Sequence, residues 1–426
     1  MINFFLKIFK TFSKSKFKFI NPPKVDIVIF DNESSNPIKE ILTDKKYLIL
    51  QTRRENIDSL FVSLKIFFLS LYYYRGNFLS SYIISLIKII KPKIVITHID
   101  NSYKFSEVAL RFKKINKKIK FIAVQNGARY EILENDYLYK KKIRKENYNK
   151  KFFIPVLFSL GNYEREIYKK LHVNVFKNIP VGSLAVEKYR KFKKKNEIVI
   201  KKKKQICLLS DHGTWQTEMA YITGDLEKNS VLLTEFCLKF SKENNYKLVI
   251  CQKRMSPGYR ANPNEKTDYE YEQIAYKKFL NKEHHKKYKK LLLKRKKKGF
   301  STYKIMEESE VLISTMSLML RENLLLRNKI LAANLTGNSI YNFPINKFFA
   351  LNENNYDSFE KKLLSIIKMS NKKYFEKLGR KVDYCIADNE YPSNIIRTYI
   401  EKYLWYNFFK NYFQCINQAN WAISTG

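Results

Sequence analysis

A histidine and an aspartate follow a short apolar run in the first half of the chain. Residues 94–97, Ile-Val-Ile-Thr, run into His98, and Asp100 lies two residues further on. A short β-branched run of this kind predicts a buried strand. Either side chain, placed at the end of a strand, could take a proton from a hydroxyl group as a general base. Asp100 could instead only orient a loop amide, so the choice of base stays open.

A polar corner follows a second apolar run, residues 121–124. It reads Gln125-Asn126-Gly127, and Arg129 lies two residues beyond the glycine. Ligands of open α/β sheets bind outside the carboxyl ends of the strands, so these side chains are expected to face a cleft. Gly127 would allow the turn, because glycine adopts backbone conformations that other residues avoid. Arg129 could bind an acidic acceptor or a phosphate.

Two hydroxyl residues and a glutamate form a third candidate group, in the second half. Ser314 and Thr315 stand where a strand should pass into a helix that opens at residue 316, and they could cap it. The free amides at such a helix start suit a phosphate. Glu322 follows Thr315 by seven residues, so the two share a face, about 10 Å apart along the axis. This spacing fits a diphosphate and a ribose, and the alternative is a capped core helix with a solvent-facing glutamate.

Three basic or imidazole side chains follow other apolar runs of the second half. Lys253 and Arg254 come directly after residues 247–252 and could offset the charge of a diphosphate. A solvated turn is the other reading of this pair. His212 comes shortly after residues 205–210 and could donate to a phosphate oxygen, or it could be a surface histidine in a loop.

Strands alternate with helices along the whole chain, which predicts mainly parallel, doubly wound α/β sheets. We expect two similar α/β domains with a cleft between them. Helices are expected at 57–74, 79–90, 356–378 and 393–409. The expected strands are 25–30, 47–51, 94–97, 121–124, 152–158, 178–181, 205–210, 247–252, 311–314, 330–334 and 348–351.

The length of 426 residues favours two domains over one. The boundaries that we predict are a basic amphipathic segment at 1–24, an N-terminal Rossmann-like domain at 25–185, a charged linker at 186–204, a C-terminal Rossmann-like domain at 205–390, and a C-terminal helix and tail at 391–426. The linker is predicted because residues 189–204 are rich in lysine and offer little that could form a core.

The net charge of +41, from 81 Lys and Arg against 40 Asp and Glu, indicates an anionic partner. The basic, aromatic N-terminal segment could lie on an anionic membrane face, or it could be an ordinary helix packed on the domain. Uncharged runs at 66–74 and 76–87 are shorter than the ~18 residues of a membrane span. No nucleic-acid-binding motif accompanies the charge. The five cysteines are scattered without a CxxC pair, so we expect no disulfide framework and no zinc site. We expect no cofactor besides the donor substrate, and the need for a metal ion stays open.

Several segments in order resemble a known family. The first half contains ITHIDNSYKFSEVA, FIAVQNGARYE, FSLGNYEREIY and IPVGSLA, which look like bacterial surface carbohydrate biosynthesis proteins. In those proteins a similar Gln-Asn-Gly turn replaces the Gln-His-Gly of polyol-phosphate and capsule transferases. The second half, with its strand, Ser-Thr, helix with Glu, and strand KILAANLTG, resembles the nucleotide-binding domain of GT-B glycosyltransferases. The resemblance covers most of residues 25–350.

The resemblance implies two Rossmann-like domains that face a cleft, the first for the acceptor and the second for the nucleotide donor, with C-terminal helices that cross back to the first domain. It also implies a cytoplasmic glycosyltransferase, peripheral to the inner face of the membrane. It would transfer a sugar or related activated unit from a nucleotide-sugar to a glycan or lipid-linked acceptor of a capsule or lipopolysaccharide. Ser314, Thr315 and Glu322 would hold the donor nucleotide. No Asp or Glu replaces His98 at the strand end, so the base is not settled by the resemblance. A sugar-nucleotide 2-epimerase-like isomerase and a non-catalytic scaffold of polysaccharide assembly are the alternatives.

Overall fold

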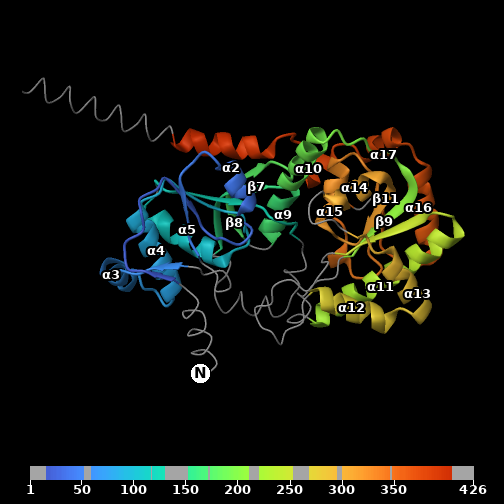
Figure 1. The fold of residues 1–426 in the computed structure, drawn as a ribbon, viewed down its shortest axis with the longest axis horizontal. Coiled ribbons are helices and arrows are strands. Elements are labelled where there is room, and N and C mark those ends of the chain that lie inside the picture. Colours follow the sequence, from blue (N-terminus) through green and yellow to red (C-terminus); the bar gives the residue numbers. More distant parts are fainter. Residues whose placement is uncertain are drawn as a thin grey trace, which may run out of the picture.

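The computed structural model describes residues 16–51, 59–116, 118–129, 152–170, 173–210, 220–252, 268–294, 300–345 and 348–404. Its described part contains two parallel sheets that form two lobes side by side (Figure 1). The predicted fold class is therefore confirmed, with two Rossmann-like α/β units. In this part of the chain, no helix combines the length and apolar character that a membrane crossing needs.

The first sheet has six parallel strands in the order β3-β2-β5-β6-β7-β8. The chain goes from β2 to β3 on one side and then returns to place β5 on the other side of β2. A switch point of this kind opens a crevice at the carboxyl ends of the two strands. The strands are β2 (Ile27–Ile29), β3 (Tyr47–Ile49), β5 (Ile94–Thr97), β6 (Lys120–Val124), β7 (Phe153–Ser159) and β8 (Asn174–Pro180).

The second sheet has five parallel strands in the order β10-β9-β11-β12-β13. Its switch point lies between β9 and β11, by the same argument. The strands are β9 (Lys203–Leu209), β10 (Lys247–Cys251), β11 (Ser309–Ser314), β12 (Ile330–Ala333) and β13 (Ala350–Leu351). A separate parallel pair, β1 (Lys16–Lys18) with β4 (Ser59–Phe61), lies outside both sheets and was not predicted.

Helices connect the strands, and many begin at a serine or asparagine whose side chain accepts a backbone N–H, as at Asn77, Ser102 and Ser183. In the first half they are α2 (Asn36–Ile41), α3 (Leu64–Tyr72), α4 (Phe78–Ile90), α5 (Tyr103–Ile115), α9 (Tyr163–Lys170) and α10 (Leu184–Lys195). In the second half they are α11 (Ala220–Glu243), α12 (Asp268–Phe279), α13 (Lys282–Leu291), α14 (Ser301–Glu308), α15 (Leu318–Leu325), η3 (Ser339–Tyr341), α16 (Tyr356–Lys368), α17 (Asn371–Leu378) and α18 (Lys381–Cys385).

The first sheet buries both of its faces, as a parallel sheet covered by helices must. Val28 and Ile29 are neighbours on β2, and they belong to the separate cores on its opposite faces. The helix at 392–404 packs Ile396 and Ile400 into one of these cores. The chain therefore crosses back from the second lobe to the first, as predicted, and this helix lies along the first lobe in Figure 1.

The chain differs from the predicted elements in three places. Residues 59–74 hold β4 and then α3, and residues 356–378 hold two helices because Ser370 caps α17. Residues 405–409 of the expected helix at 393–409 lie outside the described residues. The expected linker at 186–204 begins as α10, and this helix buries Val186 and Tyr189. A lysine-rich helix can still have one buried face, so a lack of core residues was the wrong expectation for this stretch. The domain boundaries themselves stay a prediction.

Candidate functional site

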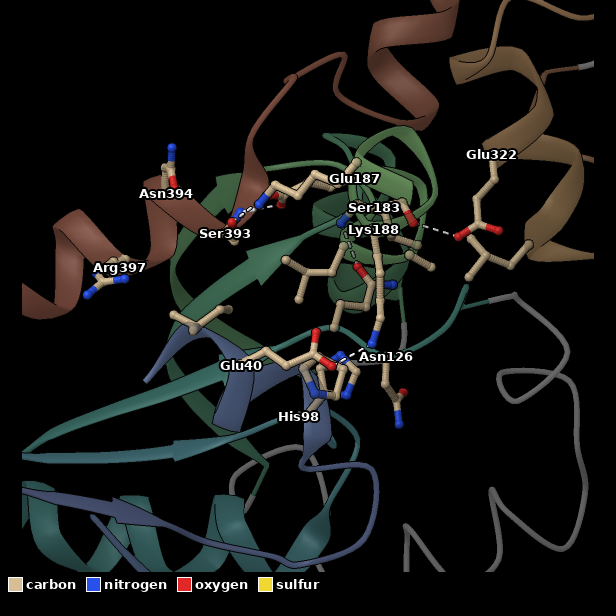
Figure 2. A pocket seen from close by; sticks show the side chains of 18 of the residues that line it. Glu40, His98, Asn126, Ser183, Glu187, Lys188, Glu322, Ser393, Asn394 and Arg397 are labelled. Atoms are coloured by element: carbon tan, nitrogen blue, oxygen red, sulfur yellow. Dashed lines mark hydrogen bonds and ion pairs between the residues drawn. The ribbon is translucent and has the colours of Figure 1, made fainter. Parts of the chain in front are cut away.

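A cavity of about 380 Å³ lies where the two lobes meet, at the carboxyl ends of the strands of the first sheet (Figure 2). Its walls come from α2, the loops after β5, β6 and β7, the start of α10, α15 and the 392–404 helix. The lining residues are Pro37, Glu40, Ile41, His98, Gln125, Asn126, Leu160, Ser183, Leu184, Ala185, Glu187, Lys188, Lys191, Phe300, Leu318, Glu322, Ser393, Asn394 and Arg397.

His98 lies at the switch point of the first sheet, in the loop after β5. Its Nδ1 is 2.8 Å from the backbone oxygen of Ser34, in the loop after β2. A carbonyl oxygen only accepts hydrogen bonds, so Nδ1 carries the proton and Nε2 is the basic nitrogen of the neutral ring. Burial lowers the pKa of His98, against the hydrogen bond to Ser34 and the charge of Asp100. The ring is therefore neutral near pH 7 and suited to accept a proton.

Asp100 is fully buried, and both of its carboxylate oxygens are occupied. Oδ2 accepts hydrogen bonds from the Arg129 Nε at 3.0 Å and from the Tyr168 hydroxyl. Oδ1 accepts from the Arg129 Nη2 and from the backbone N–H of Asn126 at 3.3 Å. The prediction that Asp100 could act as a base is wrong for this arrangement, because the carboxylate has no access to the cavity. Its other predicted role, orienting a loop amide, agrees with its contact to Asn126.

Arg129 is also buried and forms the cationic half of this ion pair. Burial disfavours the charged guanidinium, but the carboxylate of Asp100 outweighs burial and raises the pKa of Arg129. Its Nη2 donates to the side-chain oxygen of Asn126 at 2.9 Å. The expectation that Arg129 binds an acidic acceptor is therefore wrong. Together, Asp100 and Arg129 hold the Asn126 amide and side chain at the rim of the cavity.

The Gln125-Asn126-Gly127 corner faces the cavity, but its members differ in what they can do. Gln125 is buried, donates to the Gly127 oxygen at 2.7 Å, and accepts from the Leu160 N–H at 2.9 Å. It therefore ties the end of β6 to the end of β7. Asn126 is exposed and is free to meet a ligand with the part of its side chain that Arg129 does not hold. Gly127 has no positive φ, so the prediction that the turn needs a glycine is wrong.

Substitution by alanine should have different effects on stability at Gly127 and at Gly182, which precedes α10. A Cβ on Gly127 would only approach Arg129 Nη1 at 3.7 Å, whereas on Gly182, at φ +88°, it would stand 2.4 Å from the Ala387 oxygen. We expect Gly182→Ala to lower the free energy of unfolding by about 1–3 kcal/mol or more. Gly127→Ala should change it by less than about 1 kcal/mol. Denaturant unfolding measures both, and equal losses would contradict the assignment.

Ser314 and Thr315 stand at the end of β11 but do not cap the following helix. Ser314 donates to the Leu209 oxygen at 3.0 Å, and Thr315 accepts from Asn229 Nδ2 at 2.7 Å. The helix, α15, begins at Leu318 and is capped by Ser317. The predicted start at residue 316 and the predicted cap are therefore wrong. Ser314 joins β11 to β9 at the switch point of the second sheet.

Glu322 lies on α15 and lines the cavity from the side of the second lobe (Figure 2). Its Oε1 accepts from the Ser183 hydroxyl at 2.6 Å, and its Oε2 accepts from the Tyr303 hydroxyl at 2.8 Å. Burial raises the pKa of Glu322, while these two hydrogen bonds oppose the rise. The alternative of a solvent-facing glutamate is wrong, since the side chain is buried. Each carboxylate oxygen takes one hydroxyl donor.

A buried ion pair beside Glu322 joins the two lobes and was not predicted. Arg321 of α15 donates to Glu164 of α9, both side chains are fully buried, and the guanidinium stacks 4.9 Å from the Tyr163 ring. The only sequence signal for it is a charged pair, Arg321-Glu322, within an apolar helix. Ser183 could have been noticed from the Gly-Ser that follows β8.

Three predicted donor-site residues, His212, Lys253 and Arg254, lie outside the described residues. Among the described residues, positive charge at the cavity comes from Lys188 and Lys191 on α10 and from Arg397 of the 392–404 helix. Lys188 pairs with Glu40 and Lys191 with Glu187. Across the described ranges, no group of three or more His, Cys, Asp or Glu is arranged to hold a metal ion.

Comparison with known proteins gives structural neighbours but no sequence relatives. Neither a protein-family model nor a curated protein matches the chain. Among solved structures, it is similar to the wall teichoic acid polymerase TagF soaked with CDPG, at 14% identity over 91% of this chain and 90% of that chain, with a TM-score of 0.49. It is also similar to UDP-GlcNAc 2-epimerase from Neisseria meningitidis, at 12% identity over 88% and 99%, with a TM-score of 0.47.

A third neighbour is the UDP-forming α,α-trehalose-phosphate synthase from Burkholderia xenovorans, at 10% identity over 89% of this chain and 97% of that chain, with a TM-score of 0.46. Because the identities are this low and the TM-scores are below 0.5, we assign neither a substrate nor a residue role to this chain from these structures.

Proposed function

We propose that the protein is a transferase that uses a nucleotide-activated donor and builds a surface polysaccharide. The donor would be a nucleotide-sugar or a related activated unit, and the acceptor a glycan or a lipid-linked glycan of a capsule or lipopolysaccharide. One observation supports this most: the neutral His98 of one lobe and the buried carboxylate of Glu322 in the other line a single cavity. Such a crevice holds a base and a polyol-binding group on opposite walls.

Glu322 suits the ribose of a nucleotide because a vicinal diol offers one hydroxyl to each carboxylate oxygen. Ser183 and Tyr303 provide two such hydroxyls to Glu322. A ribose could take their place without leaving either oxygen of the buried carboxylate unpaired. The diphosphate would then lie toward the start of α15 and toward Lys188 and Lys191, where amides and ammonium groups offset its charge.

The chemical step follows from the position of His98. An acceptor hydroxyl in the cavity would donate its hydrogen bond to Nε2, while Asn126 orients the hydroxyl from the neighbouring loop. Its oxygen would attack the activated atom of the donor, and the bond from that atom to the nucleotide phosphate would break. The electron pair leaves with the phosphate, and the proton goes to Nε2. Ser34 keeps Nε2 as the accepting nitrogen throughout.

The two lobes would divide the work between acceptor and donor. Residues 25–185 would bind the acceptor, and residues 205–390 would bind the nucleotide. A lipid-linked acceptor would lie at a membrane, and the net charge of +41 suits an anionic inner leaflet, so we place the enzyme in the cytoplasm, peripheral to that face. His212, Lys253 and Arg254 remain candidates for phosphate binding in the donor half.

A nucleotide panel tests the proposal. The purified chain should show a rise in melting temperature with one class of nucleoside diphosphate, because a ligand that binds only the folded state stabilises it. A labelled nucleotide-sugar of that class should then lose its label to an added acceptor. Conversion of the sugar without an acceptor would identify an isomerase instead. If no nucleotide or nucleotide-sugar shifts the melting temperature, the proposed donor site is wrong.

Glu322→Gln should weaken nucleotide binding by about 10- to 100-fold, since an acceptor that loses its charge forms weaker hydrogen bonds with hydroxyls. The substitution keeps the size of the side chain, so the fold should be preserved. Glu376→Gln is the matched control, because Glu376 is an exposed residue of α17 that does not line the cavity, and it should leave nucleotide affinity unchanged. Calorimetric titration measures both variants. Equal affinities of Glu322→Gln and the unsubstituted protein would rule out the assigned ribose contact.

A further inference from the structure

Large apolar side chains gather on the outer end of the first lobe, far from the cavity. Phe19 is 79% exposed, Leu64 is 77% exposed and Tyr72 is 73% exposed. The same region exposes Phe17, Ile20, Val62, Phe67, Phe68, Leu71, Tyr74, Phe78 and Leu79. Large apolar side chains exposed singly are ordinary, but a contiguous group of them marks an interaction site. We name this group, on β1, α3 and the start of α4, the α3 surface.

Helix α3 is apolar on both of its sides. Ile66 and Ser70 face inward, and α3 packs on α4 with a hydrogen bond of 3.2 Å from Ser70 to Ser85. Phe67, Phe68 and Leu71 lie on the outward side and are at least half exposed. A helix that is hydrophobic all round is normally covered all round. Here the described residues cover only the inner side.

The N-terminal strand extends the same surface. β1 pairs with β4, the backbone N–H of Val62 donates to the Lys18 oxygen at 2.8 Å, and the Ser63 hydroxyl donates to Asn21 at 2.7 Å. These contacts fix the exposed residues 17–20 beside the start of α3. The aromatic side chains of both segments therefore belong to one continuous patch.

The charged side chains of the two segments that carry this surface are all positive. The segments 16–25 and 59–91 contain no aspartate or glutamate. Their exposed cations include Lys16, Lys18, Lys24, Lys65 and Arg75. Apolar and aromatic side chains surrounded by lysines match an anionic lipid surface, in which rings sit at the headgroup level and ammonium groups meet lipid phosphates. Two copies of the chain would instead bring like charges together in a symmetric contact.

We propose that the α3 surface docks the protein on an anionic lipid bilayer. The outward side chains of α3 and the rings of residues 17 and 19 would enter the boundary between headgroups and acyl chains. The surrounding lysines would contact the headgroups. Figure 1 shows α3 at the end of the first lobe that points away from the second lobe. Docking there would leave the cavity between the lobes open, and it would not depend on the proposed transfer chemistry.

Flotation with lipid vesicles tests this surface. The protein should float with phosphatidylcholine vesicles that contain phosphatidylglycerol, and less with phosphatidylcholine alone. The double variant Phe67→Ser/Phe68→Ser should bind these vesicles at least about tenfold more weakly. Lys65→Glu should weaken binding several-fold at low salt and less at high salt, because bulk ions screen the attraction to the headgroups. All three substituted side chains are solvent-exposed, so the melting temperature should stay unchanged.

Phe176→Ser is the matched control, because Phe176 is 79% exposed but lies on β8, outside the α3 surface. It should leave vesicle binding intact. Binding that survives in the Phe67→Ser/Phe68→Ser variant, or the absence of any binding to anionic vesicles, would overturn the proposal. A dimer in sedimentation experiments that dissociates in the double variant would also overturn it, and would assign the surface to a second copy of the chain. None of these outcomes involves nucleotide binding.

Discussion

Replacement of His98 by alanine is expected to lower the rate of transfer by about 10²- to 10⁴-fold, with little change in nucleotide affinity. The imidazole is the group in the cavity whose position and protonation both suit a base. Ser34 fixes its Nδ1–H, and Asp100, the other candidate, is buried in an ion pair. Single-turnover transfer with the labelled donor measures the rate, and calorimetric titration measures the affinity.

The pH dependence gives a second test of the same residue. Burial lowers the pKa of His98 below its usual 6.5, so the ring is already neutral at pH 7. Transfer by the unsubstituted protein should therefore be constant near pH 7 and fall as the pH drops through that lowered pKa. The His98→Ala variant should lose this acidic limb. His285→Ala is the control, because His285 lies on α13 and does not line the cavity. A His98→Ala rate close to normal would show that another group is the base.

The strands could be predicted from the sequence because parallel strands buried on both faces are continuous apolar runs. Ile94–Thr97 is such a run, and the structure places β5 at those residues. The polar residues that end each run lie at the binding edge, since the carboxyl ends of parallel strands meet there. His98, Gln125 and Asn126 line one cavity for this reason.

The roles of the individual residues could not be predicted in the same way, because they depend on partners far along the chain. Asp100 looks like a base until Arg129 and Tyr168 are seen to occupy its oxygens, 29 and 68 residues later. Glu322 looks solvent-facing until Ser183, 139 residues earlier, donates to it. Burial of a charge requires a partner, and a local pattern does not contain the partner.

The exposure of the outward face of α3 could not be predicted from the sequence either. Its apolar residues were visible in the sequence, but the same run could have been a covered core helix. Whether Phe68 and Leu71 are exposed depends on where α4 packs, and only the fold determines that. The uncharged runs were also too short to span a bilayer. This excluded a transmembrane helix but did not distinguish a helix on a membrane surface from a covered core helix. The length of a helix does not show whether it lies on a membrane surface.

Arg129→Met should lower the free energy of unfolding by about 3–5 kcal/mol. The substitution keeps the bulk of the side chain but leaves the carboxylate of Asp100 buried without its cation. The hydrogen bonds that remain to Asp100, from Tyr168 and from the Asn126 N–H, do not replace a positive charge. Denaturant unfolding in the absence of ligands measures the loss. Asn126 should also lose its fixed orientation, so transfer should slow even where the variant is folded.

Two further variants distinguish the loss of stability from breaking a buried ion pair from the loss caused by removing a surface charge. Lys93→Met removes a cation that is paired with Asp26 at 3.1 Å on the same lobe, and both side chains of that pair are partly exposed. It should change stability by less than about 1 kcal/mol, because water screens the pair. The double variant Asp100→Leu/Arg129→Met removes both buried charges and should recover much of the loss, since apolar replacements of a whole buried pair are often neutral. If Arg129→Met costs no more than Lys93→Met, the Asp100–Arg129 pair does not hold the Gln125-Asn126-Gly127 corner in place, and the position of Asn126 in the cavity needs another cause.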